Sequence, residues 1–93
     1  MNEMNSMIRR RITFTGMVQG VGFRWRARHA ANLYGCTGWC RNEWDGSVTM
    51  EIQGEETSID QVIDAVRNGR YIDIEGMDVQ SIPLKAERSF TTE

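Results

Sequence analysis

The segment from Gly16 to Arg24 combines three glycines with an arginine, and these residue types suit the binding of an anion. Glycine accepts positive φ angles and has no side chain, so such a loop can turn its backbone N–H groups toward one point. If a helix begins near Phe23, its unpaired N–H groups and the positive end of its dipole add to the same site. Arg24, in the first turn, can then hold phosphate oxygens with its planar guanidinium. We therefore predict a phosphate-binding loop made of Gly16, Met17, Val18, Gln19, Gly20, Val21 and Gly22.

The glycine pattern differs from the two common nucleotide-binding loops. No Gly-Lys-Ser/Thr follows it, as a Walker A loop requires, and the third glycine of the Rossmann fingerprint is missing. A glycine-rich connector followed by a surface arginine would give the same sequence. The loop taken alone therefore leaves both interpretations open.

A second segment, from Gly38 to Val48, reads Gly-Trp-Cys-Arg-Asn-Glu-Trp-Asp-Gly-Ser-Val. Together with Gly16 to Arg24, and at this separation, it closely resembles the two signatures of the acylphosphatase family, G-x-V-Q-G-V-G-F-R and G-W-V-x-N-x-x-D-G-x-V. Nine consecutive positions fit the first signature. The second departs only at Cys40, where the family usually has an aliphatic residue. The resemblance spans roughly residues 8–66, and the segment after Gly69 is more divergent.

This resemblance implies hydrolysis of a carboxyl-phosphate mixed anhydride to a carboxylate and inorganic phosphate, without a metal or cofactor. By position, it implies that Arg24 holds the phosphoryl group and that Asn42 orients the attacking water. These residue types suit the reaction, since phosphoryl transfer needs chiefly positioning and stabilisation of charge on the equatorial oxygens. The leaving carboxylate, whose conjugate acid has a pKa of about 4, departs without a proton, so no general acid is required.

Two functions of other classes are compatible with parts of the sequence. An RNA-binding module shares the strand order expected below, but the segment from Ser47 to Gln53 lacks the stacking aromatic residues of such domains. The alternative is a non-catalytic phosphate- or carbamoyl-phosphate-binding accessory domain, similar to the acylphosphatase-like module of hydrogenase-maturation carbamoyl transferases. The presence of both Arg24 and Asn42 favours the enzyme.

Hydrophobic periodicity predicts the elements on either side of the loop. Apolar alternation over residues 8–15 predicts a half-buried strand, in which Arg10 falls on the apolar side. After the loop, apolar residues at helical spacing from Phe23 to Tyr34 predict a helix with Gly35 at its left-handed C-terminal cap.

The Asp45-Gly46 pair predicts a β-hairpin between strands 37–44 and 47–53, closed by a type I′ turn in which both central residues have positive φ. A second helix is expected to open with Ser58 and Gln61 in capping-box spacing. It should bury four apolar residues on one face: Ile59, Val62, Ile63 and Val66.

The second helix should end at Asn68-Gly69, before a less regular strand within 72–82 and a short last strand near 89–92. This order predicts an α+β fold, a ferredoxin-like βαββαβ sandwich with two helices on one face of a mainly antiparallel sheet and a short extra C-terminal strand. The first and second strands then run parallel, about 9 to 10 Å apart if the third lies between them. Their C-terminal ends would bring the loop close to Asn42.

Length and composition restrict the class of protein further. The chain has 93 residues, 40% of them hydrophobic, which predicts a single domain at 7–93 after a disordered tail at 1–6. The net charge of −2 argues against non-specific nucleic-acid binding, and no apolar run approaches the roughly 20 residues of a membrane span. We expect a cytoplasmic monomer without a cofactor, whose partner is a small-molecule acyl phosphate rather than nucleic acid or a membrane.

The remaining aromatic residues and the single histidine have simpler structural interpretations. His29 falls outside the apolar face of its helix and is expected on the surface. Trp25 also lies off that face, where we expect it to shield the helix backbone rather than to cover part of the site. Trp39 and Trp44 fall where aromatic residues could either bind an acyl group or pack over the sheet, and we expect them to pack over the sheet.

The other arginines and the two cysteines are also expected to be structural. Arg9 to Arg11 and Arg41 are interpreted as solvated charges on the strands, with substrate steering as a secondary role. The chain has two cysteines, Cys36 and Cys40, and one histidine, which are too few soft ligands for a zinc site. On one extended strand the two cysteines would lie about 13 Å apart, beyond the reach of a disulfide, so we expect reduced, packed thiols.

Overall fold

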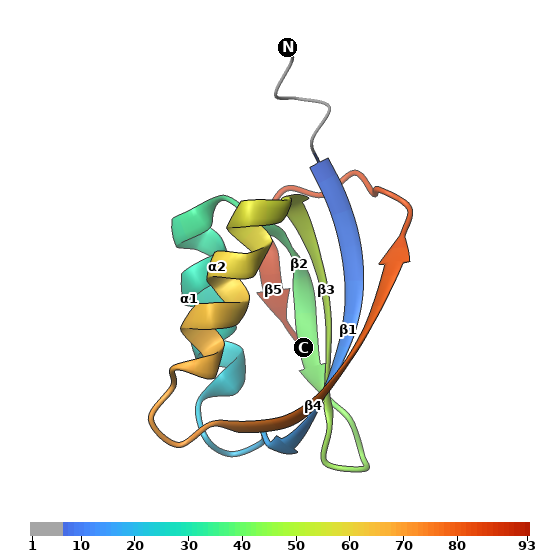
Figure 1. The fold of residues 1–93 in the computed structure, drawn as a ribbon. Coiled ribbons are helices and arrows are strands. Elements are labelled where there is room, and N and C mark those ends of the chain that lie inside the picture. Colours follow the sequence, from blue (N-terminus) through green and yellow to red (C-terminus); the bar gives the residue numbers. More distant parts are fainter. Residues whose placement is uncertain (1–6) are drawn as a thin grey trace.

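Alternating apolar residues in the strands and an apolar stripe on each helix combine into a sheet with one helical layer (Figure 1). The computed structural model describes residues 7–93. Its elements are β1 (Met7–Met17), α1 (Phe23–Tyr34), β2 (Thr37–Asn42), β3 (Val48–Glu55), α2 (Glu56–Arg67), β4 (Asp73–Ile82) and β5 (Phe90–Thr92). The strand order is β4-β1-β3-β2-β5, and the predicted ferredoxin-like sandwich with a short extra strand is confirmed. The tail predicted at 1–6 lies outside the described residues.

The sheet places the ends of β1 and β2 at the same edge. Both strands pair antiparallel with β3, so they run parallel to each other on either side of it. The short β5 pairs parallel with β2 at the edge of the sheet. The ends of β1 and β2 meet the start of α1 in the lower part of Figure 1. The loop and the hairpin that carry the predicted site residues therefore leave the sheet at the same end.

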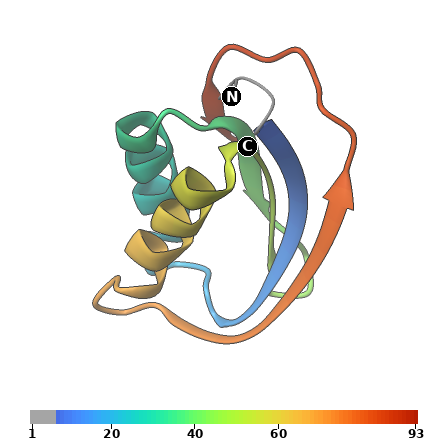
Figure 2. The same ribbon diagram turned by 45° about the horizontal axis from the view of Figure 1, so that its top comes forward.

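The core lies between the sheet and the helices, which both cover the same face (Figure 2). Phe14 of β1 and Phe23 of α1 are both fully buried, with ring centroids 4.9 Å apart at an interplanar angle of 61°. Burial of each such ring stabilises the fold by roughly 1.5–3 kcal/mol, and the edge-to-face contact adds to this. This pair joins the end of β1 to the start of α1, so the loop between them has anchored ends.

Helix α2 begins at Glu56 with Glu55 as its N-cap, three residues before the predicted N-cap Ser58, so the predicted capping box at Ser58 and Gln61 is wrong. Strand β3 runs directly into the helix, and the preceding residue makes no side-chain cap. Arg10 instead donates to Glu56 at 2.8 Å and lies 3.6 Å from Asp60. This contact explains a charge on the apolar side of β1, because Arg10 reaches the first turn of α2.

The hairpin turn differs from the predicted type I′. Gly46 has a φ of 94°, but no non-glycine among residues 7–93 has a positive φ, so Asp45 cannot form that turn. The Gly46 N–H donates to the Glu43 carbonyl at 3.2 Å, and Glu43 N–H donates to the Ser47 carbonyl at 2.8 Å. This pattern fits a three-residue loop that ends in a left-handed glycine. Asp45 accepts from the Ser47 backbone and hydroxyl at 3.0 and 2.6 Å, which favours this turn and lowers the Asp45 pKa.

The prediction that Arg9 is a solvated charge is wrong, since only 2% of the residue is exposed. Its guanidinium donates to Glu51 at 2.9 Å, to Gln53 at 3.2 Å and to Glu87 at 2.7 Å. Chiefly the hydrogen bond with Glu87 raises the pKa of Arg9. Gln53 also exchanges two hydrogen bonds of 2.9 Å with the main chain of Lys85. The segment 83–89 is thus held against the face of the sheet that the helices leave open.

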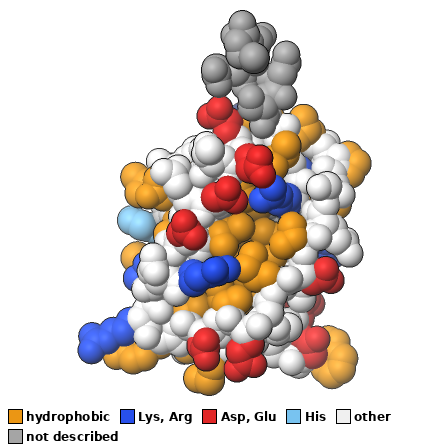
Figure 3. All heavy atoms as spheres, in the orientation of Figure 1, with side chains coloured by type: hydrophobic (Ala, Val, Ile, Leu, Met, Phe, Trp, Pro, Cys, Tyr) orange, Lys and Arg blue, Asp and Glu red, His pale blue; other side chains and the backbone are white. Residues whose placement is uncertain are grey.

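Figure 3 shows one side of the molecule, on which α2 and β4 face the reader in the orientation of Figure 1. Hydrophobic side chains gather at the middle of this surface, and charged side chains surround them. Strand β4 is the edge of the sheet, and Ile74 and Met77 on it are only half-buried against the core. Its exposed residues include three carboxylates, those of Asp73, Glu75 and Asp78.

Candidate active site

A pocket of about 180 Å³ opens where the loop, the start of α1 and the end of β2 meet. Its lining residues are Val18, Gly20, Gly22, Phe23, Arg24, Trp25 and Asn42. The structure therefore brings together both predicted catalytic residues and three residues of the predicted loop. Four other loop residues, Gly16, Met17, Gln19 and Val21, do not line this pocket.

Gly20 and Gly22 have left-handed backbones, with φ angles of 72° and 83°. No atom lies within 4 Å of the place that a Cβ would occupy at either residue, so the backbone conformation rather than space requires glycine there. Gly22 is the N-cap of α1 and makes no side-chain cap. The first N–H groups of α1 therefore lie at the end of the helix that borders the pocket, where the helix dipole is positive.

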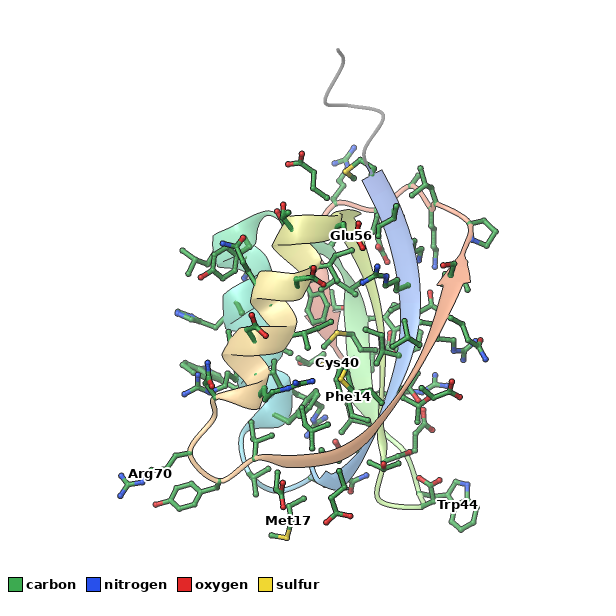
Figure 4. The ribbon with its side chains drawn as sticks, in the orientation of Figure 1. Phe14, Met17, Cys40, Trp44, Glu56 and Arg70 are labelled. Carbon is green, nitrogen blue, oxygen red and sulfur yellow. The ribbon has the colours of Figure 1, made fainter. Side chains whose placement is uncertain are left out.

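The other loop residues have structural roles. Gly16 belongs to β1, at a bulge where a Cβ would lie 2.3 Å from the Asp73 carbonyl oxygen, so the approach of β4 requires this glycine. Met17 ends β1 and is 59% exposed, extending from the lower end of the molecule in Figure 4. Val18 is buried and Val21 is packed against the core, and both anchor the loop.

Gln19 joins the loop to the hairpin. Its side-chain amide donates to the carbonyl oxygens of Glu43 and Ser47, at 2.7 and 2.9 Å. Both acceptors come from the connection that follows Asn42, between β2 and β3. A single side chain therefore sets the loop against the strand end that carries Asn42. The sequence pattern placed Gln19 in the loop but did not indicate this contact, because its partners are main-chain atoms.

Arg24 lies in the first turn of α1 and is partly buried. Its Nη1 donates to the main-chain oxygen of Glu93 at 2.7 Å. Glu93 is itself held beside β2, because its N–H donates to the Cys40 carbonyl at 2.9 Å. One contact thus orients the guanidinium, whose fork carries five N–H donors in all, and the others are available for an anion in the pocket.

Asn42 is the last residue of β2 and is exposed at the pocket. It pairs in register with Val48, which is fully buried and fixes this end of the strand. An asparagine amide both donates and accepts hydrogen bonds, so it can hold a water molecule in a defined orientation. Next to it, Glu43 has a lowered pKa, first because of a hydrogen bond from Thr49 and then because of Arg41. That carboxylate is therefore charged at neutral pH.

Two of the predictions for aromatic residues are wrong. Trp25, expected only to shield the helix, lines the pocket, because side chains in a first helical turn lean toward the N-terminus. Trp44, expected to pack over the sheet, is 97% exposed at the hairpin and points away from the molecule in Figure 4. Trp39 is partly buried beneath the Arg41 guanidinium, 5.0 Å from its ring centroid. His29 is exposed, as predicted.

Both cysteines are buried, as predicted, and neither forms a disulfide among residues 7–93. Burial raises the pKa of Cys36 to about 11. Burial also raises the pKa of Cys40 to about 12, while the positive charge of Arg24 opposes the shift. Figure 4 shows Cys40 between the sheet and the helices, and Cys40 is not among the residues that line the pocket. Neither thiol is a nucleophile at neutral pH.

The sequence model of the Acylphosphatase family matches residues 10–92. The chain belongs to the acylphosphatase family. It is 38% identical over 79 residues to an acylphosphatase of Oceanobacillus iheyensis, a match that covers 83% of this chain and 87% of that protein. The crystal structure of acylphosphatase from Bacillus subtilis superposes with a TM-score of 0.86 at 30% identity, covering 92% of this chain and 98% of that chain.

The same fold is found within a larger protein. Full-length HypF, crystallised in a phosphate- and nucleotide-bound form, superposes with a TM-score of 0.81 at 25% identity. The match covers 94% of this chain but 12% of the HypF chain. Acylphosphatase relatives, in contrast, are matched over most of their own length.

Proposed function

We propose that this acylphosphatase-family protein hydrolyses acyl phosphates to a carboxylate and inorganic phosphate, with Arg24 and Asn42 as its catalytic residues. One observation supports this assignment above all: the pocket gathers the loop backbone, a guanidinium and an amide at one end of the sheet. Family and fold support the same reaction. A non-catalytic domain is not favoured, since the relatives with which the chain shares most of its length are named acylphosphatases.

The phosphoryl group would lie at the start of α1, against the backbone N–H groups near Gly20 and Gly22. In the transition state, negative charge spreads over its equatorial oxygens and is stabilised by hydrogen-bond donors. These N–H groups are already oriented by the left-handed glycines. Arg24 adds a full positive charge and a fork of donors. Because Glu93 orients the guanidinium, little reorganisation is needed when the substrate binds.

Asn42 would hold the attacking water in line with the bond that breaks. The amide oxygen accepts a hydrogen bond from the water, which directs a water lone pair toward phosphorus. As the new P–O bond forms, the bond to the acyl oxygen breaks, and the electron pair leaves with the carboxylate. The water loses its protons to solvent and phosphate. The carboxylate needs no proton, because its conjugate acid has a pKa of about 4.

The direct test is hydrolysis of acetyl and benzoyl phosphate by the purified protein in the presence of EDTA. We expect turnover well above the uncatalysed rate, because no step assigned above uses a metal. Arg24→Ala should reduce kcat/KM by at least about 10²-fold, the scale of one lost charge-stabilising group. Arg70→Ala, which removes an exposed arginine outside the pocket, should have no effect. Absence of turnover by the unaltered protein would contradict the proposal.

Among residues 7–93, no helix has the length and apolar character needed to cross a membrane. We propose a cytoplasmic monomer that meets its substrate by diffusion. Sedimentation of the purified protein at several concentrations measures the oligomeric state, and a concentration-independent mass of one chain is the expected result.

A further inference from the structure

We propose that Trp25 forms the wall against which the acyl group packs, so that the enzyme favours acyl phosphates with an aromatic acyl group over those with a small aliphatic one. This inference rests on the proposed function, because it concerns the leaving-group side of the same pocket. It assigns a specificity role to a residue that the reaction chemistry does not require.

The apolar side chains that line the pocket differ in their exposure. Val18 and Phe23 line it but are buried, with 1% and 2% of their surface exposed. Trp25 is 61% exposed. It is therefore the one large apolar side chain of the pocket lining that offers a substantial area to a ligand. Covering part of an indole is favourable both through apolar burial and through ring stacking.

A stacking partner restricts the orientation of the indole. Its ring stacks on His29, one helical turn further along α1, with centroids 5.1 Å apart and planes at 8°. Side chains on a helix lean toward its N-terminus, so the indole face opposite His29 turns toward the loop at Gly20 and Gly22. A platform with a fixed orientation loses little conformational entropy when a ligand packs on it.

The direction of the reaction determines on which side of the pocket the acyl group lies. In an in-line displacement the leaving group lies opposite the attacking water. Asn42, which orients the water, enters the pocket from the end of β2, whereas Trp25 enters from α1. With the phosphoryl group held between them by the loop and Arg24, the acyl group extends toward the helix side. There it meets the indole.

The test compares kcat/KM for benzoyl phosphate and acetyl phosphate in matched variants. We expect Trp25→Ala to lower the value for benzoyl phosphate by about 3- to 10-fold, the range of one lost aromatic contact, while acetyl phosphate changes by less than about 2-fold. Trp25→Phe should restore most of the preference. Trp44→Ala, which removes an exposed tryptophan outside the pocket, should leave the ratio unchanged. An unchanged ratio in Trp25→Ala would overturn the inference.

A binding measurement separates this inference from the proposed function. Benzylphosphonate and methylphosphonate keep the anionic group but cannot be hydrolysed as acyl phosphates. Calorimetry should show tighter binding of benzylphosphonate, and Trp25→Ala should remove that difference. If the unaltered protein turned over neither acyl phosphate yet kept this preference, the proposed function would fail and the role of Trp25 would stand. Equal affinities for the two phosphonates would overturn the role of Trp25 whether or not turnover is seen.

Discussion

At the scale of single residues, binding and chemistry are assigned to different side chains. Arg24 carries the charge that an anion needs, and its main-chain partner at Glu93 keeps it in place. Asn42 carries no charge and stands at a strand end. A change at Asn42 should therefore affect catalysis without a comparable effect on phosphate affinity.

Asn42→Ala tests this separation. We expect kcat to fall by about 10²-fold or more, the cost of one lost oriented polar group, while inhibition by inorganic phosphate stays within about 2-fold. Asn32→Ala is the matched control, because Asn32 is exposed on α1 and lies outside the pocket. Steady-state kinetics with phosphate as a competitive inhibitor measures both quantities. An equal loss of phosphate affinity would show that Asn42 binds the phosphoryl group instead.

The buried thiols predict a loss of stability in alkali. Burial raises the pKa of Cys36 to about 11 and that of Cys40 to about 12, whereas an unfolded thiol ionises near about 8.5. Between these values the folded chain binds more protons than the unfolded chain, so the free energy of unfolding decreases as pH rises. The stabilisation that comes from keeping the thiols protonated is complete below about pH 8.5. Above that pH, each thiol lowers the free energy of unfolding by up to about 1.4 kcal/mol per pH unit.

Cys40→Val isolates one of the two thiols, since valine fills a similar volume and does not ionise. We expect its unfolding free energy to fall less steeply than that of the unaltered protein between about pH 9 and 11. Urea denaturation at a series of pH values gives the two slopes, and the values below about pH 8 provide the control. Identical slopes above pH 9 would mean that Cys40 ionises as readily in the folded chain as in the unfolded one.

At the scale of elements, the contact of Gln19 connects the two parts of the site. The loop arises from β1 and the hairpin from β2 and β3, so neither part alone determines the distance between Arg24 and Asn42. The Gln19 amide spans them with two hydrogen bonds to the hairpin backbone. We infer that it positions the loop and need not touch the substrate.

Gln19→Ala should lower kcat/KM by about 10-fold, and it should destabilise the fold by about 1–3 kcal/mol through loss of two hydrogen bonds. Gln80→Ala, at an exposed position of β4, is the control for the loss of a glutamine side chain. Kinetics at a temperature where both variants remain folded separates the effect on the site from the effect on stability. Full activity of folded Gln19→Ala would exclude a positioning role.

The elements also explain which features the sequence could predict. Arg24 and Asn42 stand within short, distinctive segments, and the helix and hairpin that place them follow from local periodicity. Gly16 fitted the loop pattern, but a glycine is required at this position because β4, more than fifty residues later in the chain, approaches it closely. The burial of Arg9 depends in the same way on Glu87. Contacts between distant segments leave no periodic signal, so these roles became visible only in the folded structure.

At the scale of the whole molecule, the network around Arg9 holds the C-terminal part of the chain in place. Arg9 of β1 and Gln53 of β3 bind the segment 83–89, which leads from β4 to β5. Strand β5 then brings Glu93 to Arg24. The segment after Gly69 thus contributes to the geometry of the site at the other end of the sheet.

Glu87→Ala tests this network. We expect the free energy of unfolding to fall by about 1.5–3 kcal/mol, because Arg9 is buried and loses one of its charged partners. Glu75→Ala, at an exposed position of β4, should change stability by less than about 0.5 kcal/mol. Urea denaturation monitored by tryptophan fluorescence measures both variants. Equal stability of the two would show that Glu51 and Gln53 satisfy Arg9 without Glu87.

The strand order has a consequence for synthesis on the ribosome. Strand β1 leaves the ribosome before all the other described strands, yet it lies between β3 and β4 in the sheet. Its partner on one side ends at Glu55, and its partner on the other ends at Ile82. The growing chain therefore cannot complete the sheet around β1 until nearly all of it has emerged. Until then, the edge of β1 that faces β4 keeps unpaired backbone N–H and C=O groups, which are a template for pairing with another chain.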